Sequence, residues 1–353
     1  MQRCHLPALR GLAGIELAAM ADPDAARRAA LAQSASVRRY ADYRAMLADH
    51  AAEAVAVCVP PHVLAEIGLA VLEAGKHLFI EKPMALSQDD AQRLVQRAAG
   101  AGVQATVGFN LRWHRLVRQA RSVLDAGTLG APVTMHTTFA SRSAFAAGDS
   151  QWRGRPELGG GALFDLGIHH FDLWRFLLRC EVEEVFARGC GNESAVEYLA
   201  LNAVMANGVL VTASFSHGVG DRNEVEICGT KGRLSLSCYR FDGLRVDQNA
   251  PHGALRWWTD AAAAALRNAP SAVRRWRRGG DMIDSYRAQW SNFIDAVRNR
   301  APLQCTLADG RSALRVALAA AQSAAEGRAV RVEQAAASLI AMAPISPPGR
   351  AAG

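Results

Sequence analysis

The sequence predicts two domains: an N-terminal α/β domain with a doubly wound parallel sheet, and a C-terminal α+β domain with a mostly antiparallel, open sheet. Residues 1–108 alternate short apolar runs with stretches of helical period, which is typical of strand–helix–strand units and hence of a parallel sheet. Beyond them, strand-like runs follow one another directly, and Asn207-Gly208 between two of these runs is typical of a hairpin turn. We therefore expect domains at 1–108 and 109–332, and a tail without fixed structure at 333–353.

The elements predicted in the first domain alternate between strand and helix. A continuous apolar run at 54–59 precedes two prolines, as expected of a strand buried on both faces. Ser87 and Asp90 resemble a capping box at the start of one helix, and Gly75 ends the helix before it. The predicted strands are 15–20, 54–59, 77–80 and 104–108, and the predicted helices are 23–32, 63–74 and 87–101.

The elements predicted in the second domain are mainly strands with alternating apolar residues. The predicted strands are 132–141, 183–188, 197–205, 209–216, 222–228 and 232–237. Two helices are expected near the end of the domain, at 285–298 and 307–326.

The composition excludes several classes of protein. Of the 353 residues, 50% are hydrophobic and 21% are charged, which argues against global disorder. No apolar run approaches the length of roughly 18 residues that a membrane span needs, and no secretion signal opens the chain. The net charge of +7 is not accompanied by a nucleic-acid-binding module. The seven cysteines lack metal-ligand or disulfide spacing, which favours a cytoplasmic location and no metal site.

The first chemical signal is Glu81-Lys82-Pro83, directly after a predicted strand. Ligands of open α/β sheets bind beyond the carboxyl ends of the strands, so Lys82 is expected to point toward a ligand. Pro83 restricts Lys82 to extended geometry. A turn with a surface lysine is the competing interpretation of this tripeptide.

The second signal is the run Gly159–Gly161 followed by Asp165 and His169. Glycines let the backbone approach a ligand closely. On a helix, Asp165 and His169 share one face, and a carboxylate beside an imidazole is the arrangement that a general base needs. A capped helix with a core histidine is the competing interpretation. A metal site with His170 and Asp172 is disfavoured, because adjacent histidines on a helix diverge by about 100°.

The third signal is Asp22 at the end of a predicted strand. An acidic residue there can accept hydrogen bonds from a ribose diol and would repel a 2′-phosphate. A helix-capping role explains Asp22 equally well.

Taken together, these residues resemble the Gfo/Idh/MocA family of NAD(P)-dependent oxidoreductases, over about residues 4–332. The matching stretches are His5–Leu9, Ala21–Pro23, Val59–His62, Ala74–His77, Glu81–Pro83, Val107–Asn110, Gly161 with Asp165 and His169, and Tyr286 with Phe293–Arg298. The resemblance implies a Rossmann domain that binds NAD, with NADP not excluded because Arg27 and Arg28 lie close to Asp22. It also implies an α+β domain whose sheet mediates assembly into a homodimer or homotetramer.

The resemblance implies site residues as well. The catalytic set is Lys82, Asp165 and His169. The implied cofactor contacts are Asp22, Val59, Pro60, His62, Glu81 and Lys82. The implied substrate contacts are Lys82, Asn110, Arg112, Trp152, Arg153, Asp165 and His169.

The sequence departs from the family at its N-terminus. The family begins with a strand followed by G-x-G-x-x-G, whereas the only candidate substitute here, Gly11 with Gly14, precedes a strand and cannot form a phosphate loop. We expect the first, central strand of the sheet to be missing. Our hypothesis is that Met1 is an internal methionine and that the natural chain starts roughly 15–25 residues upstream.

The expected function is hydride transfer between nicotinamide and a hydroxyl carbon of a sugar or polyol, inositol-like or nucleotide-linked. The arginine-rich stretch 267–280, with Trp257 and Trp258 before it, favours an anionic or nucleotide-linked sugar by its charge. One alternative is an NAD-dependent glycoside hydrolase, which would release an aglycone without net NADH. Another is a non-catalytic nucleotide-binding regulator, which would bind cofactor without turnover. No nucleic-acid or membrane partner is expected.

Overall fold

The computed structural model describes residues 4–10, 12–31, 37–49, 52–142, 152, 155, 158–192, 195–248 and 280–334. The chain divides into two compact units. Unit 1 comprises Met1–Phe109 and Tyr286–Arg311, and unit 2 comprises Asn110–Ser285 and Ser312–Gly353. The segment Tyr286–Arg311 therefore joins the first unit, although the sequence placed it within 109–332.

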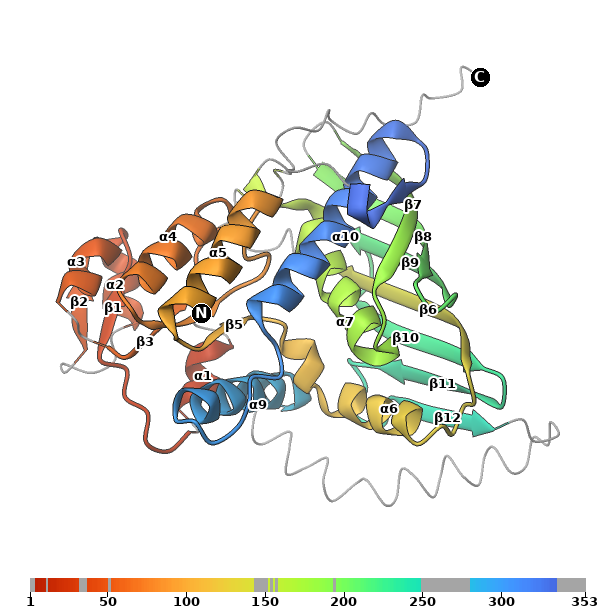
Figure 1. The fold of residues 1–353 in the computed structure, drawn as a ribbon, viewed down its shortest axis with the longest axis horizontal. Helices are drawn as coiled ribbons and strands as arrows, with labels where there is room; N and C mark the ends of the chain where they lie inside the picture. Colours follow the sequence, from red (N-terminus) through yellow and green to blue (C-terminus); the bar gives the residue numbers. More distant parts are fainter. Residues whose placement is uncertain are drawn as a thin grey trace. The chain divides into compact units, whose positions relative to one another are not determined.

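Unit 1 is built from short parallel strands and helices (Figure 1). Its strands are β1 (Ala19–Ala21), β2 (Arg38–Tyr40), β3 (Ala54–Val57), β4 (His77–Ile80) and β5 (Ala105–Val107). Its helices are α1 (His5–Leu9), α2 (Ala25–Leu31), α3 (Tyr43–Ala48), α4 (Pro61–Glu73) and α5 (Gln88–Ala101). Helices α9 (Gly280–Val297) and α10 (Leu307–Glu326) each have residues in both units.

The strands of unit 1 form two parallel sheets rather than one: β1 pairs with β2, and β3, β4 and β5 form a separate sheet in that order. The strand expected at 15–20 is regular only at Ala19–Ala21. Among the described residues, no strand pairs with both β1 and β3, which is where the order 3-2-1-4-5-6 places the first strand. The alternation of strand and helix, and with it the Rossmann-like character, is confirmed.

Helix α5 shows how closely local sequence fixes these elements. The Ser87 side chain accepts a hydrogen bond from the Asp90 amide at 3.1 Å, as the predicted cap requires. Gly102, with a φ of 65°, ends the helix in the left-handed conformation that glycine tolerates best. Leu94 on the inner face is fully buried.

Unit 2 contains an eight-stranded sheet in the order β12-β11-β10-β6-β9-β8-β7-β13. Its strands are β6 (Pro132–Ser141), β7 (Val182–Asn192), β8 (Ala195–Met205), β9 (Leu210–His217), β10 (Arg222–Gly229), β11 (Gly232–Ser237), β12 (Leu244–Gln248) and β13 (Val330–Arg331). Strands β6 and β9 pair in parallel, and the other neighbouring strands of this sheet pair antiparallel. The predicted mostly antiparallel sheet is thus confirmed, including the Asn207-Gly208 turn between β8 and β9.

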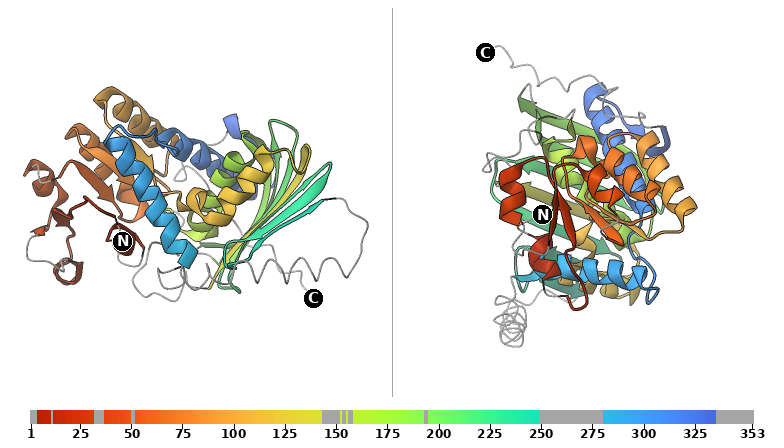
Figure 2. Two further views of the ribbon diagram at one scale, coloured as in Figure 1. Left: turned by 90° about the horizontal axis from the view of Figure 1, so that it is seen from below. Right: turned by 90° about the vertical axis from the view of Figure 1, so that its left-hand side faces the viewer.

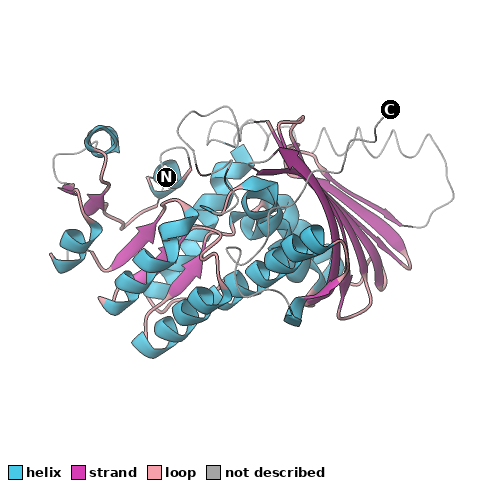
Figure 3. Cartoon of the chain, turned by 90° about the horizontal axis from the view of Figure 1, so that it is seen from above, coloured by secondary structure: helices cyan, strands magenta, loops and turns pink. Residues whose placement is uncertain are grey.

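Helices of unit 2 pack on one face of this sheet, as Figures 2 and 3 show. Among them are α6 (Arg115–Asp125) and α7 (Ile168–Leu178). The core between α7 and the sheet is aromatic: Phe215 of β9 meets Phe171 and Trp174 of α7 at centroid distances of 5.5 and 6.4 Å. This packing fixes α7, and therefore His169 and His170, against the strand that ends at His217.

Some sequence predictions concern residues outside the described ranges. These are Arg153, the arginine-rich stretch up to residue 279, Trp257, Trp258 and the tail from residue 335. In the part of the chain that the structure describes, no helix has the length and apolar character needed to cross a membrane.

Candidate functional site

In unit 1, several predicted site residues follow the strands at the carboxyl edge of the β3-β4-β5 sheet. The last residues of the strands are in register, with Val57 opposite Ile80 and Ile80 opposite Val107. The Glu81 amide donates to the Val57 carbonyl at 3.0 Å, and the Gly108 amide donates to the Ile80 carbonyl at 2.8 Å. The residues that follow each strand therefore start side by side along the edge where ligands of such sheets bind.

Glu81 and Lys82 follow β4 at this edge. The Lys82 amide donates to Glu81 Oε2 at 3.2 Å, and the Lys82-Pro83 peptide bond is cis. The other carboxylate oxygen of Glu81 lies 2.9 Å from His5 Nε2 of α1. The structure thus brings together Glu81 and Lys82, which the sequence predicted, and adds His5, which the sequence analysis used only as part of a matching stretch.

Gly108 lets the β5 backbone pass close to the Glu81 carboxylate. A Cβ atom at Gly108 would lie 2.6 Å from Glu81 Oε1 and 2.9 Å from its Cδ. Both distances are shorter than van der Waals contact, so a side chain here would push the carboxylate away from His5 and Lys82.

We therefore expect Gly108→Ala to lower the free energy of unfolding by about 1–3 kcal/mol, the usual cost of overpacking. Urea unfolding followed by tryptophan fluorescence measures the change. Gly100→Ala in α5 is the matched control, because a Cβ there meets nothing within 4 Å. Equal midpoints for the Gly108 variant and the wild type would show that the carboxylate is not held in place.

Asp22, Val59, Pro60 and His62 are the other predicted cofactor contacts. Asp22 follows β1, and its Oδ1 accepts a hydrogen bond from the Asp24 amide at 2.8 Å. Arg28 donates to the Asp22 carbonyl at 2.5 Å. Val59 and Pro60 follow β3, Pro60 is the N-cap of α4, and His62 lies in the first turn of that helix.

This donor set fits part of a nicotinamide dinucleotide. The half-buried Asp22 carboxylate at a strand end suits a ribose diol, and the β3-β4-β5 edge suits a ligand that spans several strands. Gly14 does not belong to a phosphate loop: it lies between α1 and β1, and Arg298 donates to its carbonyl at 2.5 Å. Among the described residues, no G-x-G-x-x-G turn joins a strand to a helix.

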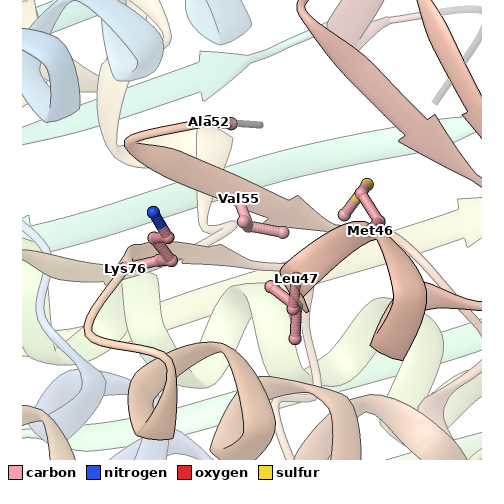
Figure 4. A pocket seen from close by; sticks show the side chains of 5 residues that line it. All are labelled: Met46, Leu47, Ala52, Val55 and Lys76. Carbon is pink, nitrogen blue, oxygen red and sulfur yellow. The ribbon is translucent and has the colours of Figure 1, made fainter. Parts of the chain in front are cut away.

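A hollow lined by Met46, Leu47, Ala52, Val55 and Lys76 lies elsewhere in unit 1 (Figure 4). Ala52 and Lys76 precede β3 and β4, so the hollow is at the amino ends of these strands. Ligands of open α/β sheets bind at the opposite edge, which leaves this hollow outside the candidate site.

In unit 2, the predicted site residues are Asp165 and His169. Residues Leu163–Gly167 form one π-helical turn that continues into α7. Such turns occur frequently at functional sites. Because Gly167 has no side chain, this turn packs closely against Phe215 of β9: a Cβ atom at Gly167 would lie 3.1 Å from the Phe215 ring.

Asp165 has a partner that the sequence analysis missed. Its Oδ2 lies 3.5 Å from Nε2 of His217, the last residue of β9, whose side chain is only 1% exposed. One weak sequence signal points to His217: the alternation of β9 places it on the same buried face as Phe215. His169, half-buried in the next turn, lies near the Phe139 ring, with centroids 6.1 Å apart.

Two predicted substrate contacts are buried among polar partners of unit 2. Arg112 donates from Nε to Asp172 Oδ2 at 2.7 Å and from Nη2 to Oδ1 at 2.5 Å. Asn110 donates to the Ser285 hydroxyl at 3.0 Å. Both side chains therefore make contacts that stabilise the fold, and the Asp172 carboxylate is paired with the Arg112 guanidinium. The backbone carbonyl of Trp152 accepts a hydrogen bond from the Arg155 amide at 3.0 Å.

His170 is a buried neutral histidine beside this turn. Its Nε2 donates to Asn223 Oδ1 at 3.1 Å, and the side chain is fully buried. Burial lowers the pKa of His170 to about 4, against which the Asn223 hydrogen bond acts weakly. Between about pH 4 and pH 6.5, His170 therefore stays uncharged in the folded protein, whereas the same side chain is protonated in the unfolded chain.

We expect this histidine to make the protein less stable in mild acid. Because the pKa is lower in the folded than in the unfolded state, stability is complete above about pH 6.5 and falls as the pH drops toward 4. The expected loss of unfolding free energy between pH 7 and pH 5 is about 2 kcal/mol. Urea titrations at each pH measure it, and His170→Gln, which keeps a donor for Asn223 but does not titrate, should flatten the dependence. An equally steep dependence in that variant would assign it to other groups.

Comparison with known proteins places the chain among oxidoreductases. Residues 1–109 match the model of an oxidoreductase family with an NAD-binding Rossmann fold, and residues 117–235 match the GFO/IDH/MocA C-terminal domain. Myo-inositol 2-dehydrogenase of Thermotoga maritima is 28% identical over 307 residues, covering 84% of this chain and 85% of the relative. D-apiose dehydrogenase of Paraburkholderia graminis is 29% identical over 353 residues, covering 94% and 87%.

A solved structure has the same fold. The WlbA dehydrogenase from Bordetella pertussis, in complex with NADH and UDP-GlcNAcA, superposes with a TM-score of 0.80 at 19% identity, covering 94% of each chain. The two family models follow one another along the chain in the order that the structure gives its parallel and antiparallel sheets. The chain belongs to the Gfo/Idh/MocA family of oxidoreductases, with the NAD-binding Rossmann domain of that family followed by its C-terminal domain.

Proposed function

We propose that the protein is a dehydrogenase that oxidises a CH–OH group of a sugar or polyol, inositol-like or nucleotide-linked, with NAD as its preferred cofactor. The observation that carries the proposal is the position of Lys82 at the carboxyl edge of the sheet in a domain of an NAD-binding family. The named relatives support the substrate class, since they act on inositol and apiose. Asp22 favours NAD over NADP, because its charge opposes a 2′-phosphate.

Each residue of the proposed catalytic set has one task. His169 takes the proton of the substrate hydroxyl, and Asp165 stabilises the imidazolium that forms. The Lys82 ammonium donates a hydrogen bond to the same oxygen as negative charge develops on it. A bound nicotinamide would supply the acceptor for the hydride of the substrate carbon. Glu81, Val59, Pro60 and His62 contact the cofactor, and Trp152 and Arg153 contact the substrate.

We further propose that the protein acts in the cytoplasm as a homodimer or homotetramer. The absence of disulfide or metal spacing among its cysteines supports a reducing compartment. Size-exclusion chromatography with light scattering measures the assembly.

The proposal is tested by following absorbance at 340 nm with NAD or NADP and a panel of myo-inositol, scyllo-inositol, D-apiose, D-xylose and UDP-linked uronic acids. We expect NADH to form with at least one of them, and more slowly with NADP. Binding of NADH, measured by thermal shift, together with no reduction of cofactor by any substrate of the panel would favour the non-catalytic nucleotide-binding regulator. Release of a chromogenic aglycone without net NADH would favour the glycoside hydrolase.

A further inference from the structure

Three side chains connect helix α9 to the backbone of Lys82 within unit 1. Trp290 Nε1 of α9 donates to His5 Nδ1 at 3.1 Å. His5 Nε2 lies 2.9 Å from Glu81 Oε1, and Glu81 Oε2 accepts the Lys82 amide at 3.2 Å. We refer to these side chains as the Trp290–His5–Glu81 chain. It spans 285 residues of sequence and ends at the one lysine that the proposed function requires.

The hydrogen bonds of this chain run in one direction. An indole nitrogen can only donate, so His5 Nδ1 must accept, and the proton of the imidazole resides on Nε2. His5 therefore donates to the Glu81 carboxylate rather than competing with it for a proton. The tautomer of His5 is set by Trp290, in the way that a neighbouring hydrogen bond fixes a catalytic histidine.

Aromatic packing holds the imidazole in this orientation. The His5 side chain is 4% exposed, and its ring meets Tyr286 and Phe79 edge to face at 4.9 and 5.5 Å. Trp290 in turn stacks on Phe79 at 4.1 Å. Because all of these rings are packed, His5 cannot rotate away from Glu81 without opening the cluster.

The Glu81 carboxylate lies in surroundings that are poor in water. Its side chain is 19% exposed, and Gly108 leaves just enough space for it. Burial raises the pKa of the neighbouring Cys58 thiol to about 12, and the Glu81 charge acts in the same direction. A carboxylate in such a place needs fixed donors, and His5 and the Lys82 amide are two of them.

We propose that the Trp290–His5–Glu81 chain is a positioning device for Lys82. His5 fixes the Glu81 carboxylate, and the carboxylate fixes the backbone from which the Lys82 side chain reaches the substrate oxygen. The inference rests on the proposed function for the task of Lys82, but not for the contacts themselves. His5, Trp290 and Glu81 are positioning residues in this account, since they act through Lys82.

The test compares His5→Leu with His5→Gln in the full chain, using two measurements. The first is hydrogen exchange of the Lys82 amide. Loss of one hydrogen bond is worth about a tenfold change in an equilibrium, so His5→Leu should speed this exchange about tenfold. The second is turnover of the best substrate of the panel. Because misplacement by about 1 Å can cost a factor of about 100, kcat should fall about 10- to 100-fold while KM changes little.

His5→Gln should recover most of both quantities. A glutamine can accept from Trp290 through its oxygen and donate to Glu81 through its nitrogen, which reproduces the direction of the chain. Phe293→Leu is the matched control, because Phe293 packs on Phe79 and Trp290 in the same cluster but is not a member of the hydrogen-bonded chain. It should leave the Lys82 amide and kcat unchanged.

If His5→Leu does not fold, Trp290→Phe replaces it, since this change keeps an aromatic ring beside Phe79 and removes the donor to His5. The inference is overturned if neither His5→Leu nor Trp290→Phe alters Lys82 exchange, or if Phe293→Leu alters it equally. A wild-type chain without dehydrogenase activity would overturn the proposed function instead, while the exchange measurement would still decide whether His5 positions Lys82.

Discussion

Lys82→Ala should lower kcat for the preferred polyol by about 10²–10⁴, the range for loss of a group that stabilises charge on the reacting oxygen. The Lys82 backbone is tied to Glu81 through its amide, so removal of the side chain leaves the strand edge intact. The fold should therefore survive. Steady-state kinetics, with thermal shift in the presence of NADH, measure the two properties separately.

Lys76→Ala is the control for this experiment. Lys76 belongs to the same unit and is half-buried, but it lines the hollow at the amino ends of the strands. Loss of the Lys76 side chain should leave kcat within about twofold of the wild-type value, since Lys76 is at the opposite edge from that where ligands bind. A Lys82 variant with a rate close to that of the wild type, or a Lys76 variant with an equal loss, would contradict the assignment.

Asp172→Ala should lower the free energy of unfolding by about 3–5 kcal/mol, because it leaves the buried Arg112 charge without its partner. The two side chains are 7% and 1% exposed and form a bidentate pair, with Arg175 a further 3.9 Å from Asp172 Oδ1. Guanidinium unfolding followed by circular dichroism measures the loss.

The double variant Arg112→Leu with Asp172→Leu distinguishes the cost of an unpaired buried charge from the cost of losing the ion pair itself. Replacing both members of such a pair with apolar residues is often close to neutral, so this variant should regain most of the stability. If Asp172→Ala costs less than about 1 kcal/mol, the pair is solvated and Arg112 becomes available for the substrate contact that the sequence predicted.

Local pattern was enough to predict much of the fold. Strands β4, β6 and β11 and helix α10 begin and end where the periodicity places them. Strands β2 and β13 were not predicted, because three and two residues are too few to show a period. The strand expected at 15–20 is regular at only three residues, since a strand needs neighbours on which to extend and β1 has β2 alone among the described strands.

The candidate site was predictable where its residues are close in sequence. Lys82 follows a strand and Asp165 is four residues before His169, so local spacing marks all three as candidates, and the family resemblance assigns their roles. Contacts such as Asp165 with His217 or Arg112 with Asp172 join residues 52 or 60 positions apart, and they depend on which strand and helix meet in the core. The alternation of β9 predicts that His217 is buried, but no local pattern names the residue that it meets, which is why this contact was not predicted.

The origin of the hydride tests the central claim most directly. The best substrate of the panel, carrying deuterium on every carbon, is incubated with the protein and NAD, and the reduced cofactor is recovered for mass spectrometry. Direct transfer from a CH–OH carbon predicts NADH that is one mass unit heavier, with slower turnover than for the unlabelled substrate. Reduced cofactor without deuterium, or no reduced cofactor from any member of the panel, would contradict the account.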